Sequence, residues 1–318
     1  MQTENFRPIS KEILVQGESY AFTIYKQMDK ELFSLFLEKE TPLIQSKASL
    51  CVDEKCSALF IKTEDRTLYQ SYIQNNINTL LDDETIPLDN KTLFINEIAS
   101  ATMYYLFNHN ITTEILHDVD TTVKSSIKLI LSDTKAMYSM LKTTSYDYYT
   151  YTHCIDVASY AIGFGAYLGF DEATLIRLGK AAMMHDIGKK FIDHNIITKN
   201  GKLTPEEFDE VKKHPSLSVT ILEELNECDE ILLRAIGEHH EKCDGTGYPK
   251  GLKEDQINDL AKIVSICDVF NALTTRRSYK ERMSTYEAFG IMFGEMKKDL
   301  SEKLLNKFVS FMGCQAIK

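Results

Sequence analysis

The sequence predicts a mainly α-helical protein, in which a helical linker joins a small α+β N-terminal domain to a larger all-α C-terminal domain. The chain has 318 residues, which is enough for two domains that each bury a core. Short β-type runs mark the region before residue 96, and from residue 93 onward apolar residues recur at helical spacing. We therefore expect a small domain over 1–95, a linker over 96–145 and the larger domain over 146–318.

The region 1–95 mixes two patterns. The runs Tyr20–Tyr25 and Ala58–Ile61 contain aromatic and β-branched residues that favour strands, whereas apolar spacing from Leu68 to Leu81 favours a helix. We expect a regulatory or sensory role for this region, with its signal left open.

The segment Leu93–Lys142 has a helical pattern without Pro or Gly, so it predicts two consecutive helices or one bent helix. Two interpretations stay open. They are packing helices, or they form a signalling rod that relays an N-terminal input. A homodimer through these helices is a further hypothesis, based on their length and apolar spacing.

Helix starts are clearest in the C-terminal region. Thr204 is followed by a first-turn proline and a glutamate three residues after the cap, and Ser284 has a glutamate in the same place. A glycine-rich interruption lies at 244–251. These signals predict a domain built almost wholly from helices.

Composition excludes several classes of protein. The net charge of -11 argues against a DNA-coating surface, because phosphate contacts need clustered Lys and Arg. An anionic substrate would have to be drawn in locally, by metals. No apolar run approaches the ~20 residues that span a bilayer, and the first residues lack a signal pattern. The seven cysteines show no disulfide rhythm, so we expect a cytoplasmic protein.

Histidine and aspartate residues crowd into the C-terminal half. Any one of these histidines alone would be an ordinary core or surface residue, but together they have the composition of a site for two metal ions. Such a pair of ions holds a bridging hydroxide as nucleophile and neutralises phosphoryl oxygens, and a shared carboxylate brings the ions together. The candidate ligands are His153, His185, Asp186, His214, His239, His240 and Asp268, with Asp186 as the bridge.

The chain also contains a second His-Asp dipeptide, His117-Asp118. No comparable series of His and Asp follows it. We therefore expect this pair on an exposed helix surface.

Four blocks in order resemble the HD-GYP family. They are His185-Asp186-Ile187-Gly188-Lys189, then Lys213-His214-Pro215, then the segment His239 to Pro249, then Asp268 to Leu273. The resemblance covers roughly Tyr146 to Phe311, and the N-terminal half has no part in it. It implies an all-α HD-type core that hydrolyses cyclic di-GMP to pGpG, with GMP as a further product left open.

The resemblance also assigns roles. One metal would be held by His153, His185, Asp186 and Asp268, and the other by Asp186, His214, His239 and His240, with iron or manganese as the expected ions. The catalytic residues would be Asp186 and Lys189, the latter an electrostatic clamp or proton donor at the scissile phosphate. Substrate contacts are expected from Lys189, Arg277, Lys280, Gly247, Tyr248 and Pro249.

Competing interpretations exist for the substrate contacts. Arg277 and Lys280 are equally typical of solvated loop charges. The glycines and Pro249 are typical of an ordinary turn. Tyr248 stacks on a guanine or packs the loop, and Asp244 is expected to tie the loop by side-chain hydrogen bonds. The resemblance also implies that this loop meets a diguanylate cyclase partner.

Three positions depart from the family pattern. Tyr149 stands where some members have a Glu that helps to hold a third metal, so two metals are favoured. Ser278 replaces a common Pro, and Asn271 replaces a common Asp. Since no expected ligand is missing, an active enzyme is favoured over a cyclic di-GMP receptor or docking module. Hydrolysis of another cyclic dinucleotide stays open, because such metals do not identify the base.

Overall fold

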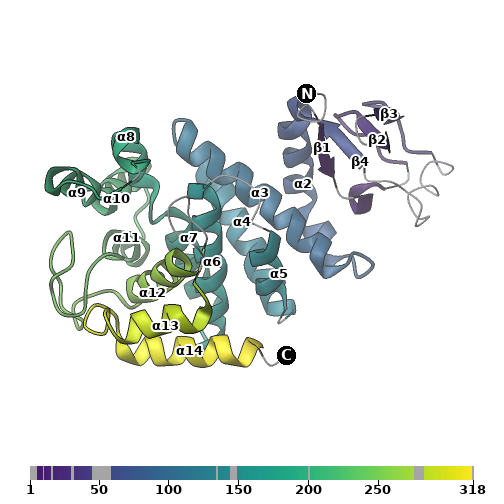
Figure 1. The fold of residues 1–318 in the computed structure, drawn as a ribbon. Helices are drawn as coiled ribbons and strands as arrows, with labels where there is room; N and C mark the ends of the chain where they lie inside the picture. Colours follow the sequence, from purple (N-terminus) through teal and green to yellow (C-terminus); the bar gives the residue numbers. More distant parts are fainter. Residues whose placement is uncertain are drawn as a thin grey trace. The chain divides into compact units, whose positions relative to one another are not determined.

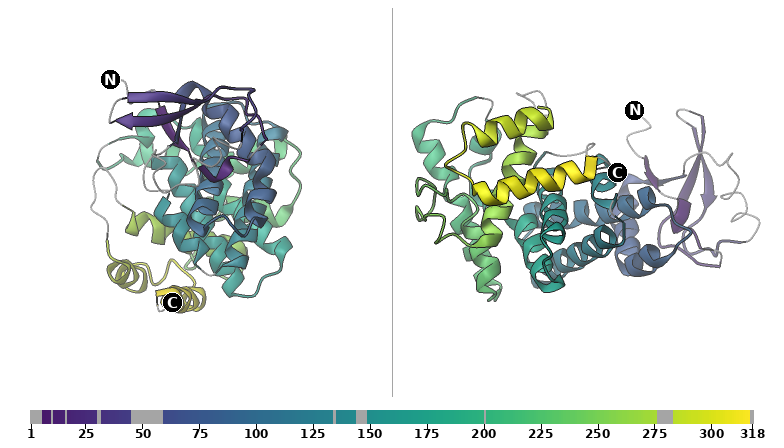
Figure 2. Two further views of the ribbon diagram at one scale, coloured as in Figure 1. Left: turned by 90° about the vertical axis from the view of Figure 1, so that its right-hand side faces the viewer. Right: turned by 90° about the horizontal axis from the view of Figure 1, so that it is seen from below.

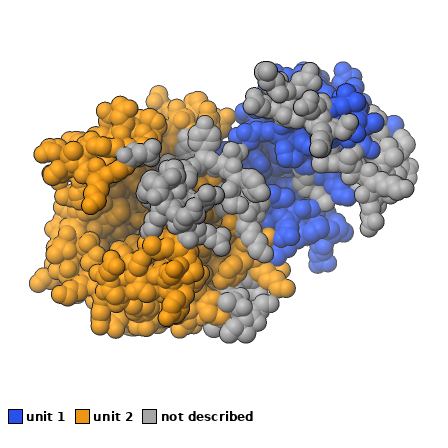
Figure 3. Space-filling view, in the orientation of Figure 1, with its two compact units in different colours: residues 1–101 blue, residues 102–318 orange. Residues whose placement is uncertain are grey.

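The computed structural model describes residues 6–9, 11–15, 17–29, 32–44, 59–133, 135–143, 149–199, 201–275 and 283–316. The chain divides into two compact units, residues 1–101 and 102–318 (Figure 3). The sequence predicted three parts with boundaries at residues 95 and 145. A division into two compact units does not test those boundaries, so they stay a prediction. Helix α3 (Leu88–Asn108) crosses the division between the units.

Unit 1 contains a four-stranded antiparallel sheet in the order β1-β4-β2-β3, drawn in purple and blue in Figures 1 and 2. Its strands are β1 (Phe6–Ile9), β2 (Ile24–Asp29), β3 (Leu32–Leu37) and β4 (Leu59–Lys62). Ile24 pairs with Ile61 across β2 and β4, and both side chains are buried. The other elements are the short 3-10 helices η2 (Lys11–Ile13) and η3 (Thr63–Asp65), and the helix α2 (Arg66–Asp82).

The expected elements of unit 1 are largely present. The helix predicted over Leu68–Leu81 lies within α2. The strand expected from Tyr20 begins only at Ile24. Tyr20 and Phe22 are buried without joining the sheet, because the Tyr20 hydroxyl accepts a hydrogen bond from the Val15 amide at 2.7 Å and so holds a loop. These aromatic residues therefore indicated burial in the core, and the prediction that they belong to a strand was wrong.

The helical segment predicted over Leu93–Lys142 consists of three helices: α3, α4 (Thr113–Ser132) and α5 (Ala136–Thr143). Breaks occur without Pro or Gly, because short polar side chains bind the backbone. Thr112 caps α4, and Asp133 accepts a hydrogen bond from the Lys135 amide at 2.8 Å. Helix α4 packs on α6 and α7, so this segment contributes to the core of unit 2.

The regular elements of unit 2 are helices throughout its described residues, apart from an isolated β-bridge between Asp244 and Lys253. Besides α4 and α5 it contains α6 (Tyr149–Tyr167), α7 (Glu172–Met184), the 3-10 helix η5 (Ile187–Phe191), α8 (His194–Ile197), α9 (Pro205–Val211), α10 (His214–Glu224), α11 (Glu230–Gly237), α12 (Asp259–Thr274), α13 (Thr285–Phe293) and α14 (Glu302–Ala316). The capping boxes predicted at Thr204 and Ser284 both form, and they start α9 and α13.

Four helices build the centre of unit 2. Helices α6 and α7 pack together, α12 packs on α6, and α11 packs on α7 and α12 (Figure 1). Asp229 caps α11 and pairs with Arg177 of α7 at 2.6 Å, so it links the two helices. Among the described residues, no helix combines the length and apolar character that crossing a bilayer requires. Since helices predominate among the described elements and the small sheet is confined to unit 1, the mainly α fold class is confirmed.

Candidate metal centre

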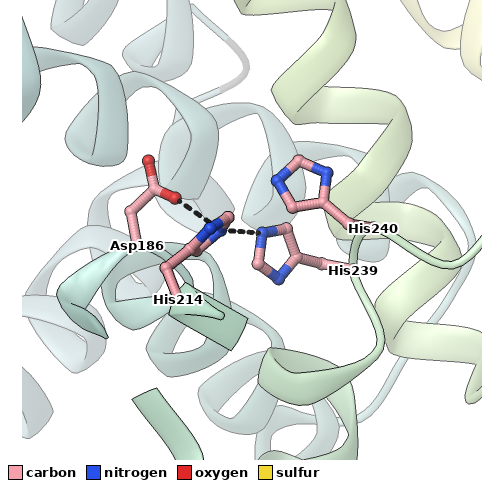
Figure 4. Close-up of side chains that lie close together, drawn as sticks. All are labelled: Asp186, His214, His239 and His240. Atoms are coloured by element: carbon pink, nitrogen blue, oxygen red, sulfur yellow. Dashed lines mark hydrogen bonds and ion pairs between the residues drawn. The ribbon is translucent and has the colours of Figure 1, made fainter. Parts of the chain in front are cut away.

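The seven predicted ligands come together in two groups. The first contains Asp186, His214, His239 and His240, and the second contains His153, His185 and Asp268; within each group the possible ligand atoms lie within 4.8 Å of one another. The groups adjoin, since His185 Nε2 lies 3.5 Å from Asp186 Oδ2. Figure 4 shows the first group, in which His214 lies between Asp186 and His239.

The ligands are supplied mainly by helix ends. His185 directly follows α7, and Asp186 comes next; His214 is the first residue of α10. The pair His239-His240 follows α11 after a single intervening residue, Glu238. His153 and Asp268 lie within α6 and α12. Packing of these helices therefore brings together residues that are far apart in the sequence.

The orientation of three imidazoles is fixed by the backbone. In His185, His214 and His239, Nδ1 lies 2.8, 2.7 and 2.6 Å from the carbonyl oxygen three residues earlier. A carbonyl oxygen only accepts, so each Nδ1 carries the proton and each Nε2 presents a lone pair. This is the arrangement that metal-binding histidines adopt.

Two observations fit a cation at this cluster. The Nε2 atoms of His214 and His239 lie 3.3 Å apart, and two facing lone pairs repel unless a cation or proton lies between them. The buried His185 Nε2 has no hydrogen-bond partner among the described residues, an arrangement that is costly without a ligand. The residues present therefore fit divalent ions.

Burial and charge tune the ligands. Burial lowers the pKa of His185, places that of His239 well below its usual value, and lowers the pKa of His240 to about 3. These imidazoles are thus neutral, which is the form that binds metals. Burial acts to raise the pKa of Asp186, but Lys189, His185 and His214 together bring it well below its usual value. The bridge candidate is therefore ionised.

Asp268 follows the same logic as Asp186. Burial acts to raise its pKa, but the hydrogen bond and charge of His153 bring the pKa far below its usual value. His153 Nε2 lies 3.0 Å from Asp268 Oδ1. Conversely, the pKa of His153 is raised, because Asp268 and Asp186 outweigh the effect of burial.

Lys189 lies beside the bridge candidate. Its Nζ is 2.6 Å from Asp186 Oδ2, and the lysine belongs to η5, directly after the His-Asp dipeptide. Burial acts to lower the pKa of Lys189, but the Asp186 carboxylate raises it by more. The ammonium thus stays charged next to the cluster.

Ser218 links two ligand segments, and no sequence pattern predicted this role. Its Oγ accepts a hydrogen bond from the Gly188 amide at 2.8 Å and lies 2.9 Å from the carbonyl oxygen of His214 and 3.1 Å from that of His185. Gly188 is needed at this contact, because a Cβ there would lie 2.1 Å from the carbonyl oxygen of His214. The Gly188 and Ser218 contact therefore sets the spacing between η5 and α10.

The glycine-rich loop after His240 is tied to the cluster. The Tyr248 ring stacks on His240 with centroids 4.8 Å apart and an interplanar angle of 30°. Burial raises the pKa of the Tyr248 phenol. A Cβ at Gly247 would lie 2.2 Å from the Lys242 amide nitrogen, so only glycine fits there. Pro249 follows Tyr248 through a cis peptide bond.

Two carboxylates hold this loop in shape. Asp244 Oδ1 accepts hydrogen bonds from the amide and hydroxyl of Thr246, which confirms the tie predicted for Asp244. The buried Glu241 accepts from the amides of Lys250 and Leu252 at 2.6 and 2.8 Å. Glu241 was missed in the sequence, although it directly follows the His-His pair.

Several sequence predictions have other outcomes. Arg277, Lys280 and Ser278 lie outside the described residues, as does the side chain of Tyr149. His117 is exposed on α4, as predicted, whereas Asp118 is half-buried, so the exposure predicted for the pair holds only for the histidine. Cys154 was not predicted, yet its thiol lies within 4.8 Å of ligand atoms of His185 and Asp186; its position next to His153 was the available signal.

A helical domain that gathers imidazoles and carboxylates around a His-Asp dipeptide at a helix end is a domain of the HD class. The family model described as HD domain matches residues 125–301, more than half of the chain. The chain therefore belongs to the HD domain family.

Curated relatives agree with this family. The chain is 33% identical over 184 residues to the cyclic di-GMP phosphodiesterase PA4108 of Pseudomonas aeruginosa, which covers 58% of this chain and 44% of the relative. It is 42% identical over 123 residues to a cyclic di-GMP phosphodiesterase of Thermotoga maritima, covering 38% and 33%. It is 38% identical over 144 residues to the 3'3'-cGAMP-specific phosphodiesterase 3 of Vibrio cholerae, covering 45% and 31%. The chain thus spans less than half the length of these relatives.

A solved structure resembles the whole chain. The HDG"Y"P protein Bd1817 of Bdellovibrio bacteriovorus matches with a TM-score of 0.66 and 21% identity, covering 97% of this chain and 100% of that chain. At this identity the likeness shows the fold. The family model and the curated relatives confirm the resemblance to the HD-GYP family that the four motif blocks indicated.

Proposed function

We propose that the chain is a metal-dependent phosphodiesterase that hydrolyses cyclic di-GMP to pGpG, with GMP as a further product left open. The observation that carries the proposal is the convergence of five imidazoles and two carboxylates, with the lone pairs of His214 and His239 facing each other at 3.3 Å. The names of the relatives from Pseudomonas aeruginosa and Thermotoga maritima support the substrate.

The ligands divide between two ions. We assign one ion to His153, His185, Asp186 and Asp268, and the other to Asp186, His214, His239 and His240. Iron or manganese suits such an imidazole-rich set. Two divalent ions would supply an activated water and neutralise the phosphoryl oxygens.

The chain's own residues do the rest. Asp186 is ionised and sits between the two groups, so it can be shared by both ions. The Lys189 ammonium faces the same space and is placed to bind a phosphate oxygen or to protonate the leaving oxygen. Tyr248, Gly247 and Pro249 lie at the cluster through the stacking of Tyr248 on His240, where a base can stack. We assign the remaining phosphate contacts to Arg277 and Lys280.

A second substrate has specific support. The relative from Vibrio cholerae is named as specific for 3'3'-cGAMP, a hybrid cyclic dinucleotide. The phosphodiester bonds of the two substrates are alike, so selection between them depends on contacts to the bases. We keep hydrolysis of the hybrid as the alternative.

Roles outside the cluster are proposals of a different kind. We assign a regulatory role to residues 1–95, docking of a diguanylate cyclase to the glycine-rich loop, and dimerisation to residues 96–145. A monomeric mass in light scattering would count against the dimer. Action on a bacterial second messenger also suits a cytoplasmic protein.

The test is a comparison of substrates. Purified protein loaded with Mn²⁺ or Fe²⁺ is incubated separately with cyclic di-GMP, 3'3'-cGAMP and cyclic di-AMP, and products are separated by chromatography. We expect cyclic di-GMP to be hydrolysed faster than the other two substrates, with pGpG as its product, and only by the metal-loaded protein. Binding of cyclic di-GMP without turnover in the loaded protein would instead support a receptor or docking module, and preferred cleavage of 3'3'-cGAMP would support the alternative substrate.

A further inference from the structure

Helices α6 and α12 each carry a candidate ligand and a second polar side chain one turn later. These pairs are His153 and Asp156 on α6, and Asp268 and Asn271 on α12. Residues three apart on a helix lie on the same face. Because α6 and α12 pack together, the four side chains meet between the two helices.

The contacts run through all four side chains. His153 Nε2 lies 3.0 Å from Asp268 Oδ1, and His153 Nδ1 lies 2.7 Å from Asn271 Oδ1. Asn271 Nδ2 donates to Asp156 Oδ2 at 3.2 Å. Asn271 is 2% exposed and Asp156 is 9% exposed. The polar contacts therefore form a series from Asp156 to Asp268 that is buried at Asn271 and Asp156 and partly buried at His153 and Asp268.

The donors and acceptors of this series have one consistent arrangement. The Asp156 carboxylate accepts, so the amide nitrogen of Asn271 faces it and the amide oxygen faces His153. His153 must then donate from Nδ1, so Nε2, which faces the Asp268 carboxylate, is the nitrogen that would bind an ion. In His185, His214 and His239 a backbone carbonyl has this role; in His153 the acceptor is a side chain that one substitution can remove.

We propose that Asn271 and Asp156 are a positioning pair for His153. Asp156 orients the Asn271 amide, and Asn271 fixes the tautomer and ring orientation of His153. The inference rests on the proposed metal assignment of His153. It also explains an amide where an aspartate is common: a carboxylate at position 271 would face Asp156 at hydrogen-bond distance, and the two charges would repel.

The experiment exchanges donor and acceptor. The variants are Asn271→Ala, Asn271→Asp, Asp156→Asn and the double variant Asn271→Asp with Asp156→Asn. The readout is metal binding, measured by Mn²⁺ titration and by chelator competition. We expect each Asn271 single variant to bind one of its two ions about 10- to 100-fold more weakly, the range for outer-sphere partners of ligands. We expect the double variant to recover near wild-type affinity, because it again places an acceptor at 271 and a donor at 156.

Controls separate this inference from the proposed function. Thr274→Ala removes a hydroxyl that donates to the carbonyl of Phe270 within α12, and it should bind two ions normally. Failure of the wild-type protein to bind two ions would defeat the metal assignment. If wild-type protein binds two ions and both Asn271 single variants bind them equally well, or if a folded double variant stays as weak as the single variants, the positioning role is wrong. Circular dichroism reports which variants fold.

Discussion

The Lys189 ammonium lies 2.6 Å from Oδ2 of Asp186, a carboxylate whose side chain is 2% exposed. The contact brings a cation to the carboxylate that both ligand groups approach. A buried carboxylate is costly unless it is paired. The pair therefore keeps Asp186 ionised and keeps a fixed positive charge beside the two ligand groups.

Replacing this cation tests its role in catalysis. In Lys189→Met we expect hydrolysis to slow by about 100-fold or more, the usual effect of losing a positioned acid or charge, with two ions still bound. Steady-state kinetics and metal analysis measure the two effects. Lys199→Met, which breaks an ion pair with Glu207, is the matched control. An unchanged rate in Lys189→Met would remove Lys189 from the mechanism.

The Ser218 hydroxyl is expected to be more important for stability than an ordinary buried serine. Ser218→Ala leaves the buried Gly188 amide without its acceptor, which costs about 1–3 kcal/mol of unfolding free energy. Ser159→Ala removes a buried hydroxyl that bonds only within α6, to the carbonyl of Ile155, so a smaller loss is expected. Urea denaturation of both variants compares them, and equal losses would contradict the linking role of Ser218.

Position 188 should tolerate no side chain. In Gly188→Ala the new Cβ would lie 2.1 Å from the His214 carbonyl oxygen, so η5 or α10 must shift and metal affinity should fall. Gly290→Ala on α13 meets nothing within 4 Å and should be neutral or stabilising by about 1 kcal/mol. Thermal melts and Mn²⁺ titration check both variants. Normal metal binding in Gly188→Ala would refute the close approach.

The ion pair between Arg177 and Asp229 links α7 and α11, and its contribution to stability should depend on pH. Burial acts to raise the pKa of Asp229, but hydrogen bonds from Arg177 and the Leu232 amide lower it below 3.8. A carboxyl group whose pKa is lower in the folded protein than in the unfolded chain stabilises the fold when the pH is above the unfolded-chain pKa. This stabilisation is lost as the pH falls through the pKa of the folded protein. Wild type should exceed Asp229→Asn in stability at pH 6, and the difference should shrink below about pH 4. Denaturation at several pH values measures it; a constant difference would contradict the charge effect.

The sequence predicted the candidate metal ligands better than it predicted the residues that hold those ligands in place. The ligands were predictable because His and Asp at motif spacing carry a chemical signal, and the helix starts were predictable because capping residues act locally. Ser218 and Asn271 act through contacts with Gly188 and His153, which are 30 and 118 residues away in the chain. A serine or asparagine inside a helix gives no local sign of such contacts. These contacts depend on how the helices pack together.

The same limit applies to the N-terminal unit. Tyr20 and Phe22 have the aromatic character of a strand, but burial in a loop satisfies them equally well. The breaks after α3 and α4 depend on Thr112 and Asp133, whose side chains compete with the helix for backbone partners. Local preference thus predicted the element types and left several boundaries to tertiary contacts.

The most direct measurement is the metal content of purified protein by inductively coupled plasma mass spectrometry, for wild type, Asp186→Ala and Asp118→Ala. Asp118 belongs to the second His-Asp dipeptide, on α4 and outside both ligand groups. We predict two ions per chain in wild type and Asp118→Ala, and loss of both ions together with hydrolysis in Asp186→Ala. Wild-type protein that binds no metal after reconstitution, or Asp186→Ala protein that keeps two ions, would contradict the shared-carboxylate centre.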